Sequence, residues 1–483
     1  MSEVNKWDSP LSFILAMIGA AVGLGNIWRF SYVLYSNGGG AFFIPYLVAI
    51  FLMGIPFLIL EYGIGFSYKD SFPNIFKKIN PKFEVISWIL VLSVFMIAIY
   101  YAVIVGWDLV YLISSINFSW GSDPALYFAN SVGGSPDLSQ ITSFMIPTII
   151  AVLVIWFLVW YISHKNLKKG IGRFSRILIP ALFIIMAIII VYSISLPGSA
   201  IGINTLLNPD WNSLTKVEIW LAAFSQILFS LSMGQAISMS YASYLPDKAR
   251  LIDDVFVVVA CNCLFEVFTA FGIFSVLGYM SATAGTPIVH LISEGTGLVF
   301  IVFPMIFNIM GPVGHIFAPI LFIAILFAGI TSAIAIIEPM VNSIMHKFDW
   351  TRKKAVTVLV CIGCCFSLIF TTGAGSYLVE IVDTFLNNFA LMPLIAIQCI
   401  VFTHCIDLDS LMSLLNENSK FKVDTPWTYI VKYILPICLL FMWVWGVFDL
   451  IGGTKTFELA VYVLLTAVLL ITSVILTRIK SKN

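Results

Sequence analysis

The sequence predicts an all-α membrane protein of about 12 transmembrane helices. Of its 483 residues, 60% are hydrophobic and only 10% are charged, whereas a soluble chain carries roughly 25% charged residues. Apolar stretches recur along almost the whole chain, each near the length of about 20 residues that a spanning helix needs. These stretches are continuous and do not alternate with polar residues, which excludes a membrane β-barrel.

The apolar stretches leave no room for a separate soluble domain. They begin near positions 11, 41, 86, 143, 176, 218, 253, 314, 353, 376, 428 and 455. The formal net charge is zero, which argues against nucleic acid as a partner. The lipid bilayer is therefore the predicted environment.

Basic residues occur in alternate loops. They concentrate in residues 66–85, 163–176, 244–252 and 346–354, whereas residues 117–142 and 283–313 contain no Lys or Arg. Cytoplasmic loops of membrane proteins are enriched in Lys and Arg. We expect a multi-pass protein of the plasma membrane with both termini in the cytoplasm.

Two of the apolar stretches are interrupted by glycines and polar residues. The first is broken at residues 23–29 (GLGNIWR), and the sixth at residues 229–236 (FSLSMGQA). Irregular backbone at membrane depth survives where it lines a protein-enclosed cavity. Matched interruptions in two halves of a chain therefore indicate a transport site. Close packing between helices, which small residues permit, is the alternative.

Several segments together resemble the neurotransmitter:sodium symporter family. They are residues 23–30, 37–42, 44–46, 54–56, 61, 100–101, 243–244, 262, 331–332 and 383. The resemblance implies a leucine-transporter-like fold, in which two inverted repeats of five helices each begin with a broken helix. The first repeat would occupy residues 1–200 and the second residues 201–405. Helices 11 and 12 would follow in residues 406–483, within a single transporter domain.

The resemblance also implies two Na⁺ sites and no chloride. Na⁺ needs several oxygen ligands to replace its hydration shell. The first site would use Ala21, Asn26, Ser230 and Asn262, with the substrate carboxylate as a further ligand. The second would use Gly19, Val22, Ala328, Thr331 and Ser332. For the last two, a hydroxyl that bonds to its own helix is the alternative.

The expected substrate is a neutral amino acid, or a similar zwitterion such as taurine, imported with sodium. By resemblance its site comprises Ala20, Ala21, Leu24, Gly25, Ile97, Tyr101, Phe229, Ser230, Ser232, Gln235 and Ile336. The amide of Gln235 favours a small or polar substrate over a large aliphatic one.

Residues expected to act as gates lie on both sides of this site. The outer group is Arg29, Asp383, Tyr101 and Phe229, and the inner group is Trp7 and Tyr244. The inner ion pair that is usual in the family is missing, because Val4 and His346 occupy its positions. Closure of the inner side therefore needs another explanation.

Glu266 follows Asn262 by one helical turn. In chloride-independent members of the family a carboxylate at this place substitutes for the anion, so we expect transport without chloride. Tyr46, Gln226 and Ser230 would surround the carboxylate, and a proton on it could offset charge during the empty return. A carboxylate that simply pairs with a neighbour is the alternative.

Other classes of function have less support in the sequence. An enzyme would need a catalytic or metal-binding constellation, but the five His fall in loops or near helix ends. A non-transporting membrane sensor on the same scaffold is the remaining alternative. We expect no enzymatic activity, a monomer or homodimer, and small zwitterions and lipid as partners.

Overall fold

The computed structural model describes residues 6–135, 138–292, 295–453 and 455–480. Apart from one isolated bridge between Phe144 and Thr372, the regular structure in these ranges is helical. Ten continuous helical segments are long and apolar enough to cross a membrane, and an eleventh span is a pair of helices bent by 52°. A shorter broken pair supplies the sixth span, so the predicted all-α class of about 12 transmembrane helices is confirmed.

The twelve spans follow the predicted order. They are α1 (Pro10–Ala21) with α2 (Leu24–Ser36), α3 (Phe43–Ala49) with α4 (Ile55–Tyr68), α6 (Glu84–Ser114), α8 (Ile146–Ser163), α9 (Ile171–Ser195), α11 (Val217–Ser230) with α12 (Ile237–Ala242), α13 (Leu251–Ala284), α15 (Gly314–Phe348), α16 (Arg352–Ser367), α17 (Gly375–Thr384) with α18 (Met392–Cys405), α20 (Thr425–Tyr429) with α21 (Leu435–Gly453), and α22 (Thr456–Arg478). Shorter connecting helices are α5 (Phe72–Ile79), α7 (Pro124–Ser131), α10 (Ser199–Leu207), α14 (Phe303–Met310) and α19 (Leu408–Asn418).

The first span breaks at Val22 and Gly23. Both residues have extended backbone, and α2 then starts at Leu24 in a new direction. The side-chain oxygen of Asn26 accepts the Gly23 N–H at 2.8 Å and so caps α2. A polar residue in an apolar run is thus used to restart the helix.

The sixth span breaks between α11 and α12. Ser232, Gly234 and Ala236 all have positive φ, which is costly for the two that carry a Cβ. Buried Glu61 of α4 stabilises the break, because it accepts hydrogen bonds from the Gly234 backbone and from Ser238 Oγ at 2.5 Å. The carboxylate therefore replaces backbone partners that a continuous helix would have supplied.

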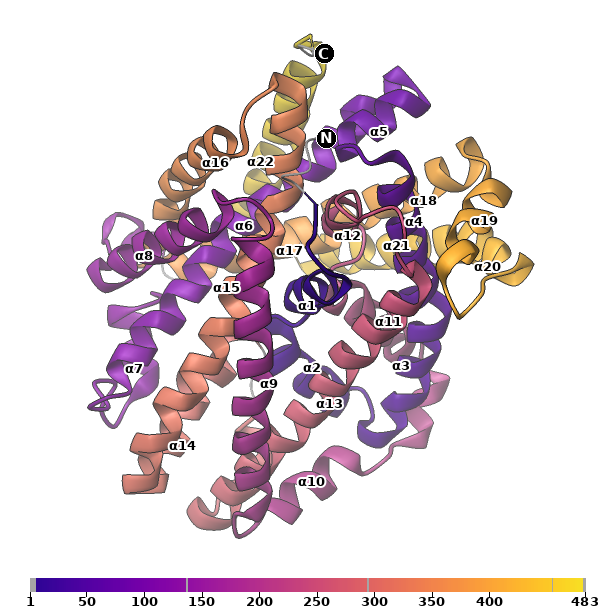
Figure 1. Cartoon of the computed structure of the whole chain (residues 1–483). Helices are drawn as coiled ribbons and strands as arrows, with labels where there is room; N and C mark the ends of the chain where they lie inside the picture. Colours follow the sequence, from indigo (N-terminus) through magenta and orange to yellow (C-terminus); the bar gives the residue numbers. More distant parts are fainter. Residues whose placement is uncertain (1–5, 136–137, 293–294, 454, 481–483) are drawn as a thin grey trace.

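The broken spans lie in the middle of the bundle. Figure 1 shows α1 and α2 near its centre, where α1 packs against α9, α13 and α15. Helices such as α22 form the periphery. Only 17% of the most apolar stretch of α22 is buried, whereas the value for the span that contains α6 is 78%. The two breaks are therefore enclosed by protein, whereas α22 presents its apolar side chains outward.

Candidate ion and substrate site

The two breaks meet at a cluster of buried polar side chains. Asn26 Nδ2 donates to Asn262 Oδ1 at 2.8 Å and to Ser230 Oγ at 3.3 Å. Asn262 Nδ2 donates to the same Ser230 oxygen at 2.5 Å. The structure thus joins three residues predicted for the first Na⁺ site, and the fourth, Ala21, is the last residue of α1.

The cluster contains the oxygens that Na⁺ requires, but its hydrogen bonds must change when an ion binds. The Asn26 amide directs its oxygen at Gly23 N–H and its nitrogen at Ser230 and Asn262. Coordination by the Asn26 oxygen therefore requires these hydrogen bonds to be exchanged for bonds to the ion. The side-chain types fit a hard cation, because hydroxyl and amide oxygens are its preferred ligands.

Glu266 adjoins this cluster and is completely buried. Its Oε1 accepts from Asn26 Nδ2 at 3.0 Å and from Gln226 Nε2 at 2.9 Å. Its Oε2 accepts from the Tyr46 hydroxyl at 2.5 Å. The carboxylate and the first predicted ion site therefore share Asn26 as a hydrogen-bonding partner.

The residues predicted for the second Na⁺ site lie where α1 meets α15. The Ser332 hydroxyl is 3.1 Å from the Gly19 carbonyl and 3.3 Å from the Val22 carbonyl. Because one hydroxyl proton serves one carbonyl at a time, the other carbonyl oxygen keeps its capacity for a cation. The Thr331 hydroxyl instead bonds back to its own helix, at 3.0 Å from the Ala328 carbonyl. All five predicted residues are thus near one another, but only Ser332 bridges the two helices by its side chain.

The predicted substrate residues surround the first break. Leu24 N–H points at the Tyr101 hydroxyl of α6 at 3.5 Å, and Ser232 Oγ donates to the Ala20 carbonyl at 3.1 Å. A Cβ added at Gly25 would meet no atom within 4 Å. The N-terminus of α2 therefore has open space beside it.

The other predicted substrate residues extend this region along three elements. Ile97 precedes Tyr101 by one turn of α6, Ile336 follows Ser332 by one turn of α15, and Gln235 is buried in the second break. The structure places Ile97 and Ile336 on helices that pack together, since α6 and α15 lie along each other.

Arg29 and Phe229, which were expected at the outer gate, are in contact. The Arg29 guanidinium lies 4.9 Å from the Phe229 ring centroid and donates to Ser225 and Gln226 of α11. Asp383 of α17 accepts from the Tyr100 hydroxyl at 2.5 Å. The first set of contacts connects α2 with α11, and the second connects α17 with α6. An outer gate would have to join these two pairs.

Comparison with known proteins identifies the family. The family model described as sodium:neurotransmitter symporter family matches residues 4–132 and 127–479, which together span almost the whole chain. The chain belongs to this family. The resemblance inferred from the motifs is confirmed, and the symporter is a multi-pass membrane protein that couples transport to sodium.

Individual relatives agree with this assignment. The chain is 38% identical over 488 residues to an uncharacterized sodium-dependent transporter of Methanocaldococcus jannaschii, covering 99% of this chain and 98% of the relative. It is 27% identical to the sodium-dependent dopamine transporter of Caenorhabditis elegans, covering 91% and 79% of the two chains. The corresponding values for the sodium-dependent serotonin transporter of Drosophila melanogaster are 28%, 92% and 76%.

A solved structure shares the fold. The crystal structure of MhsT in complex with L-phenylalanine superposes with a TM-score of 0.76 at 30% identity, covering 91% of this chain and 99% of that one. This agrees with the leucine-transporter-like arrangement of broken helices expected for the symporter.

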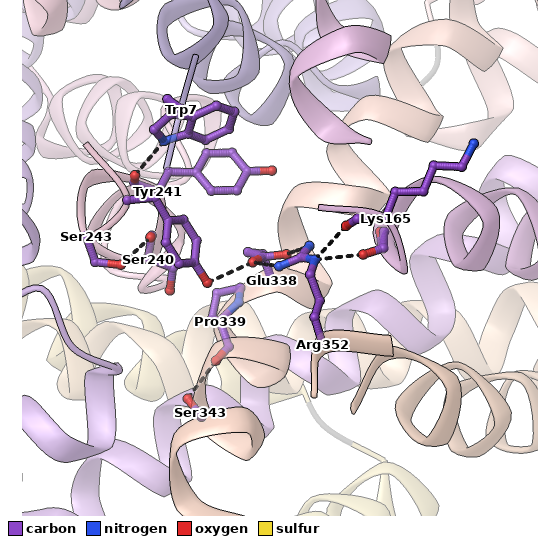
Figure 2. Close-up of polar contacts among 11 residues, drawn as sticks. Trp7, Lys165, Ser240, Tyr241, Ser243, Glu338, Pro339, Ser343 and Arg352 are labelled. Atoms are coloured by element: carbon purple, nitrogen blue, oxygen red, sulfur yellow. Dashed lines mark hydrogen bonds and ion pairs between the residues drawn. The ribbon is translucent and has the colours of Figure 1, made fainter. Parts of the chain in front are cut away.

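Trp7 and Tyr244, which were expected at the inner gate, make contacts with residues that sequence reasoning missed (Figure 2). Trp7 Nε1 donates to the Tyr241 carbonyl at 2.8 Å, and the Trp7 backbone N–H donates to the Tyr244 carbonyl at 3.2 Å. The Tyr244 hydroxyl donates to Glu338 of α15 at 3.0 Å. The segment before α1 is therefore held to the end of α12, which in turn is held to α15.

Glu338 is also the acid of a buried ion pair. Arg352 Nη1 and Nη2 donate to its two oxygens at 2.6 and 2.7 Å, and Arg352 Nε donates to the carbonyls of Ser163 and Lys165. The two charged side chains are 0% and 8% exposed. A lone carboxylate inside an apolar run was the available signal for Glu338, whereas Arg352 resembled an ordinary loop residue.

Val4 and His346 occupy the two positions where the family usually has an ion pair, and the structure describes one of them. Val4 lies outside the described residues. His346 Nδ1 is 2.9 Å from Asp70 Oδ1 in the segment before α5. Burial acts to raise the pKa of Asp70, but the bonds from His346, Lys78, Asn74 and the Ser71 N–H outweigh it and hold that pKa well below its usual range. The end of α15 is thereby tied to α5.

Proposed function

We propose that this symporter imports a small neutral amino acid, or a similar zwitterion such as taurine, with Na⁺ and without chloride. It would do so by alternating access across the plasma membrane, with both termini in the cytoplasm. The observation that carries this proposal is the position of the first helix break, with Tyr101 on one side and the Asn26, Ser230 and Asn262 cluster on the other.

The break offers matching partners for both charges of a zwitterion. The N-terminus of α2 presents backbone N–H groups at Leu24 and Gly25, which favour an anion such as a carboxylate. The C-terminus of α1 presents carbonyl oxygens at Ala20 and Ala21, which favour an ammonium group. A molecule carrying both groups close together therefore fits better than a simple anion or cation.

The same arrangement supports coupling to sodium. A substrate carboxylate at the α2 N-terminus would complete the oxygen ligands of the ion held by Asn26 and Ser230. Each ligand then raises the affinity for the other by the same factor. A second Na⁺ held by Ser332 and the α1 carbonyls would fix α1 against α15 and so favour closure of the inner side.

Uptake by purified symporter in proteoliposomes tests this proposal. We expect labelled alanine to accumulate when Na⁺ is outside, and accumulation to stop when K⁺ replaces Na⁺. Because Gln235 adds a polar amide to the site, serine, glycine or taurine should compete better than leucine or tryptophan. Strong competition by leucine would overturn the substrate class, and binding that is indifferent to the exchange of Na⁺ for K⁺ would overturn sodium coupling.

Glu266 carries the chloride part of the proposal. Its carboxylate is bonded by Asn26, Gln226 and Tyr46 beside the first ion site, where it supplies a fixed negative charge. Wild-type uptake should be equal in chloride and gluconate buffers. In Glu266→Ser the fixed charge is gone and space for an anion appears, so uptake should require chloride.

Glu266→Gln serves as the matched control, since it removes the charge but keeps the volume. It should be impaired in both buffers and should not be rescued by chloride. Strict chloride dependence of the wild type would show that the carboxylate does not replace the anion.

A further inference from the structure

Asp108 is buried in the membrane-spanning part, as are Glu61, Glu266 and Glu338, but unlike them it has no role in the contacts described above. It lies in α6 and is 0% exposed. Neither of its oxygens has a hydrogen-bond partner within the described ranges of the chain. An ionised carboxylate without a partner is very costly in a protein interior, and an ionisable group inside a membrane span is a functional candidate.

The packing of α6 against α15 fixes the position of Asp108. The Tyr101 hydroxyl bonds to Ser332, a Cβ at Gly329 would lie 2.8 Å from Val105, and the Tyr111 and Phe322 rings are 5.6 Å apart. The two helices therefore run antiparallel, and Asp108 faces the region of Ile325. Asp108 follows Tyr101 by two helical turns, about 10 Å, on the same face of α6.

This position lies beyond Tyr101 along α6, away from the inner contacts. Tyr101 faces the first helix break, whereas the contacts of Trp7 and Glu338 lie toward the other end of the bundle. In the orientation proposed above, Asp108 is therefore between the substrate site and the extracellular solution.

The charged groups on the surrounding helices do not neutralise Asp108. The titratable and charged groups of α2, α5, α7, α8, α15, α16, α17 and α22 are Arg29, Tyr32, Tyr35, Lys77, Lys78, Tyr127, Tyr161, His315, Glu338, His346, Lys347, Arg352, Lys353, Lys354, Cys361, Cys364, Cys365, Tyr377, Glu380, Asp383, Glu458, Tyr462 and Arg478. Within the described chain, the titratable group that interacts electrostatically with Asp108 is the Tyr101 hydroxyl of its own helix. His315 is about 15 Å along α15 from Ile325 and stacks on Phe118.

We propose that Asp108 holds a proton in this conformation and exchanges it with the extracellular solution when the outer path opens. On opening, water reaches the carboxyl group, and the proton leaves Asp108 for that water. On closing, the carboxylate takes a proton from the outside before it is buried again. Na⁺ fits less well, because it needs several oxygen ligands and Asp108 offers two from one group.

This inference rests on the proposed alternating-access function and adds a proton to its outer closing step. If closing requires one proton, the KM for substrate should rise with external pH, approaching tenfold per pH unit where the open-state carboxyl is ionised. In Asp108→Asn, which imitates the neutral carboxyl, this dependence on external pH should be lost. Any pH dependence that comes from Glu266 is present in both the wild type and Asp108→Asn, so it cancels when their pH slopes are compared.

The experiment measures uptake in proteoliposomes at saturating Na⁺ and fixed internal pH, with external pH varied. Glu417→Gln, at an exposed carboxylate of α19, is the matched control and should keep the wild-type pH profile. Equal pH slopes in wild type and Asp108→Asn would overturn the proposal. If Asp108→Asn keeps the wild-type pH slope but loses the Na⁺ dependence of substrate binding, Asp108 belongs to a cation site and the proton proposal is overturned.

A second measurement does not depend on uptake. The infrared difference spectrum between substrate-free and substrate-bound wild type in Na⁺ should contain the band of a buried protonated carboxyl group, and Asp108→Asn should lack it. If Asp108→Asn does not fold, the absence of any such band in the wild type still overturns the proposal. If the proposed transport function itself is wrong, the wild type will show no sodium-dependent uptake. That result differs from every outcome that concerns Asp108 alone.

Discussion

At the scale of single residues, neighbouring hydroxyls in α15 behave differently. Ser332 reaches across to the carbonyls of Gly19 and Val22 in α1, whereas Thr331 bonds to carbonyls of its own helix. The sequence shows only that two hydroxyls are adjacent. Because a β-hydroxyl can satisfy itself within a helix, the bridging role had to come from the packing of α1 on α15.

Ser332→Ala should weaken Na⁺ activation of uptake. Loss of one oxygen ligand is expected to raise the half-activating Na⁺ concentration by about five- to tenfold, equivalent to roughly 1–1.4 kcal/mol. The control is Ser343→Ala, whose hydroxyl bonds back to the Pro339 carbonyl one turn earlier in α15, at 2.6 Å. A similar Na⁺ response in both variants would argue against a sodium ligand at Ser332.

The pair of Glu338 and Arg352 gives a second prediction at this scale. Glu338→Gln leaves the Arg352 guanidinium buried without its counter-ion, so we expect a loss of about 3–5 kcal/mol in stability. The double variant Glu338→Gln with Arg352→Met removes both charges and should recover part of that loss. Thermal unfolding of the purified variants measures both effects, and a double variant less stable than Glu338→Gln would contradict this account.

At the scale of elements, close contacts between helix backbones hold the second break in place. A Cβ at Gly65 of α4 would lie 2.4 Å from the Met239 carbonyl oxygen of α12. The short helix α12 therefore rests directly on α4, near Glu61, which bonds to the break itself. The sequence predicted the interruption of the sixth span, but not the close approach of Gly65 to the backbone of α12.

Gly65→Ala should separate α4 from α12. Since the clash is with backbone, it cannot be relieved by a side-chain rotation, and we expect a loss of about 1–3 kcal/mol together with reduced uptake. Gly446→Ala in α21 is the control, because its Cβ would meet no atom within 4 Å. Equal melting temperatures for the two variants would show that the close approach is not important.

At the scale of the whole molecule, the residues predicted for the ion sites come from distant parts of the chain. The first predicted site connects α2, α11 and α13, and the second connects α1 and α15. A ligand that binds only the folded arrangement stabilises it by mass action. Sodium should therefore act on the stability of the entire bundle as well as on transport.

The melting temperature of purified symporter should be higher in NaCl than in KCl of equal ionic strength. At a Na⁺ concentration of about 100 times Kd, one site contributes roughly 2.7 kcal/mol. Asn26→Ala, which removes the side chain that joins Ser230, Asn262 and Glu266, should reduce this difference. Equal melting temperatures of the wild type in NaCl and in KCl would contradict specific sodium binding.

The sequence by itself determined the number and order of the spans, the two interruptions, and the residue types that meet there. These features depend on local composition, since a run of about 20 apolar residues spans a bilayer wherever it occurs in the chain. A glycine and polar segment within such a run weakens the helix for equally local reasons.

Only the tertiary structure decided which polar groups are partners. Glu338 pairs with Arg352, Trp7 binds the end of α12, and Asp108 has no hydrogen-bond partner among the residues that the structure describes. These outcomes depend on how helices far apart in sequence pack. The sequence placed the charges within the membrane. The fold determined which of them are neutralised by protein and which must be neutralised in another way.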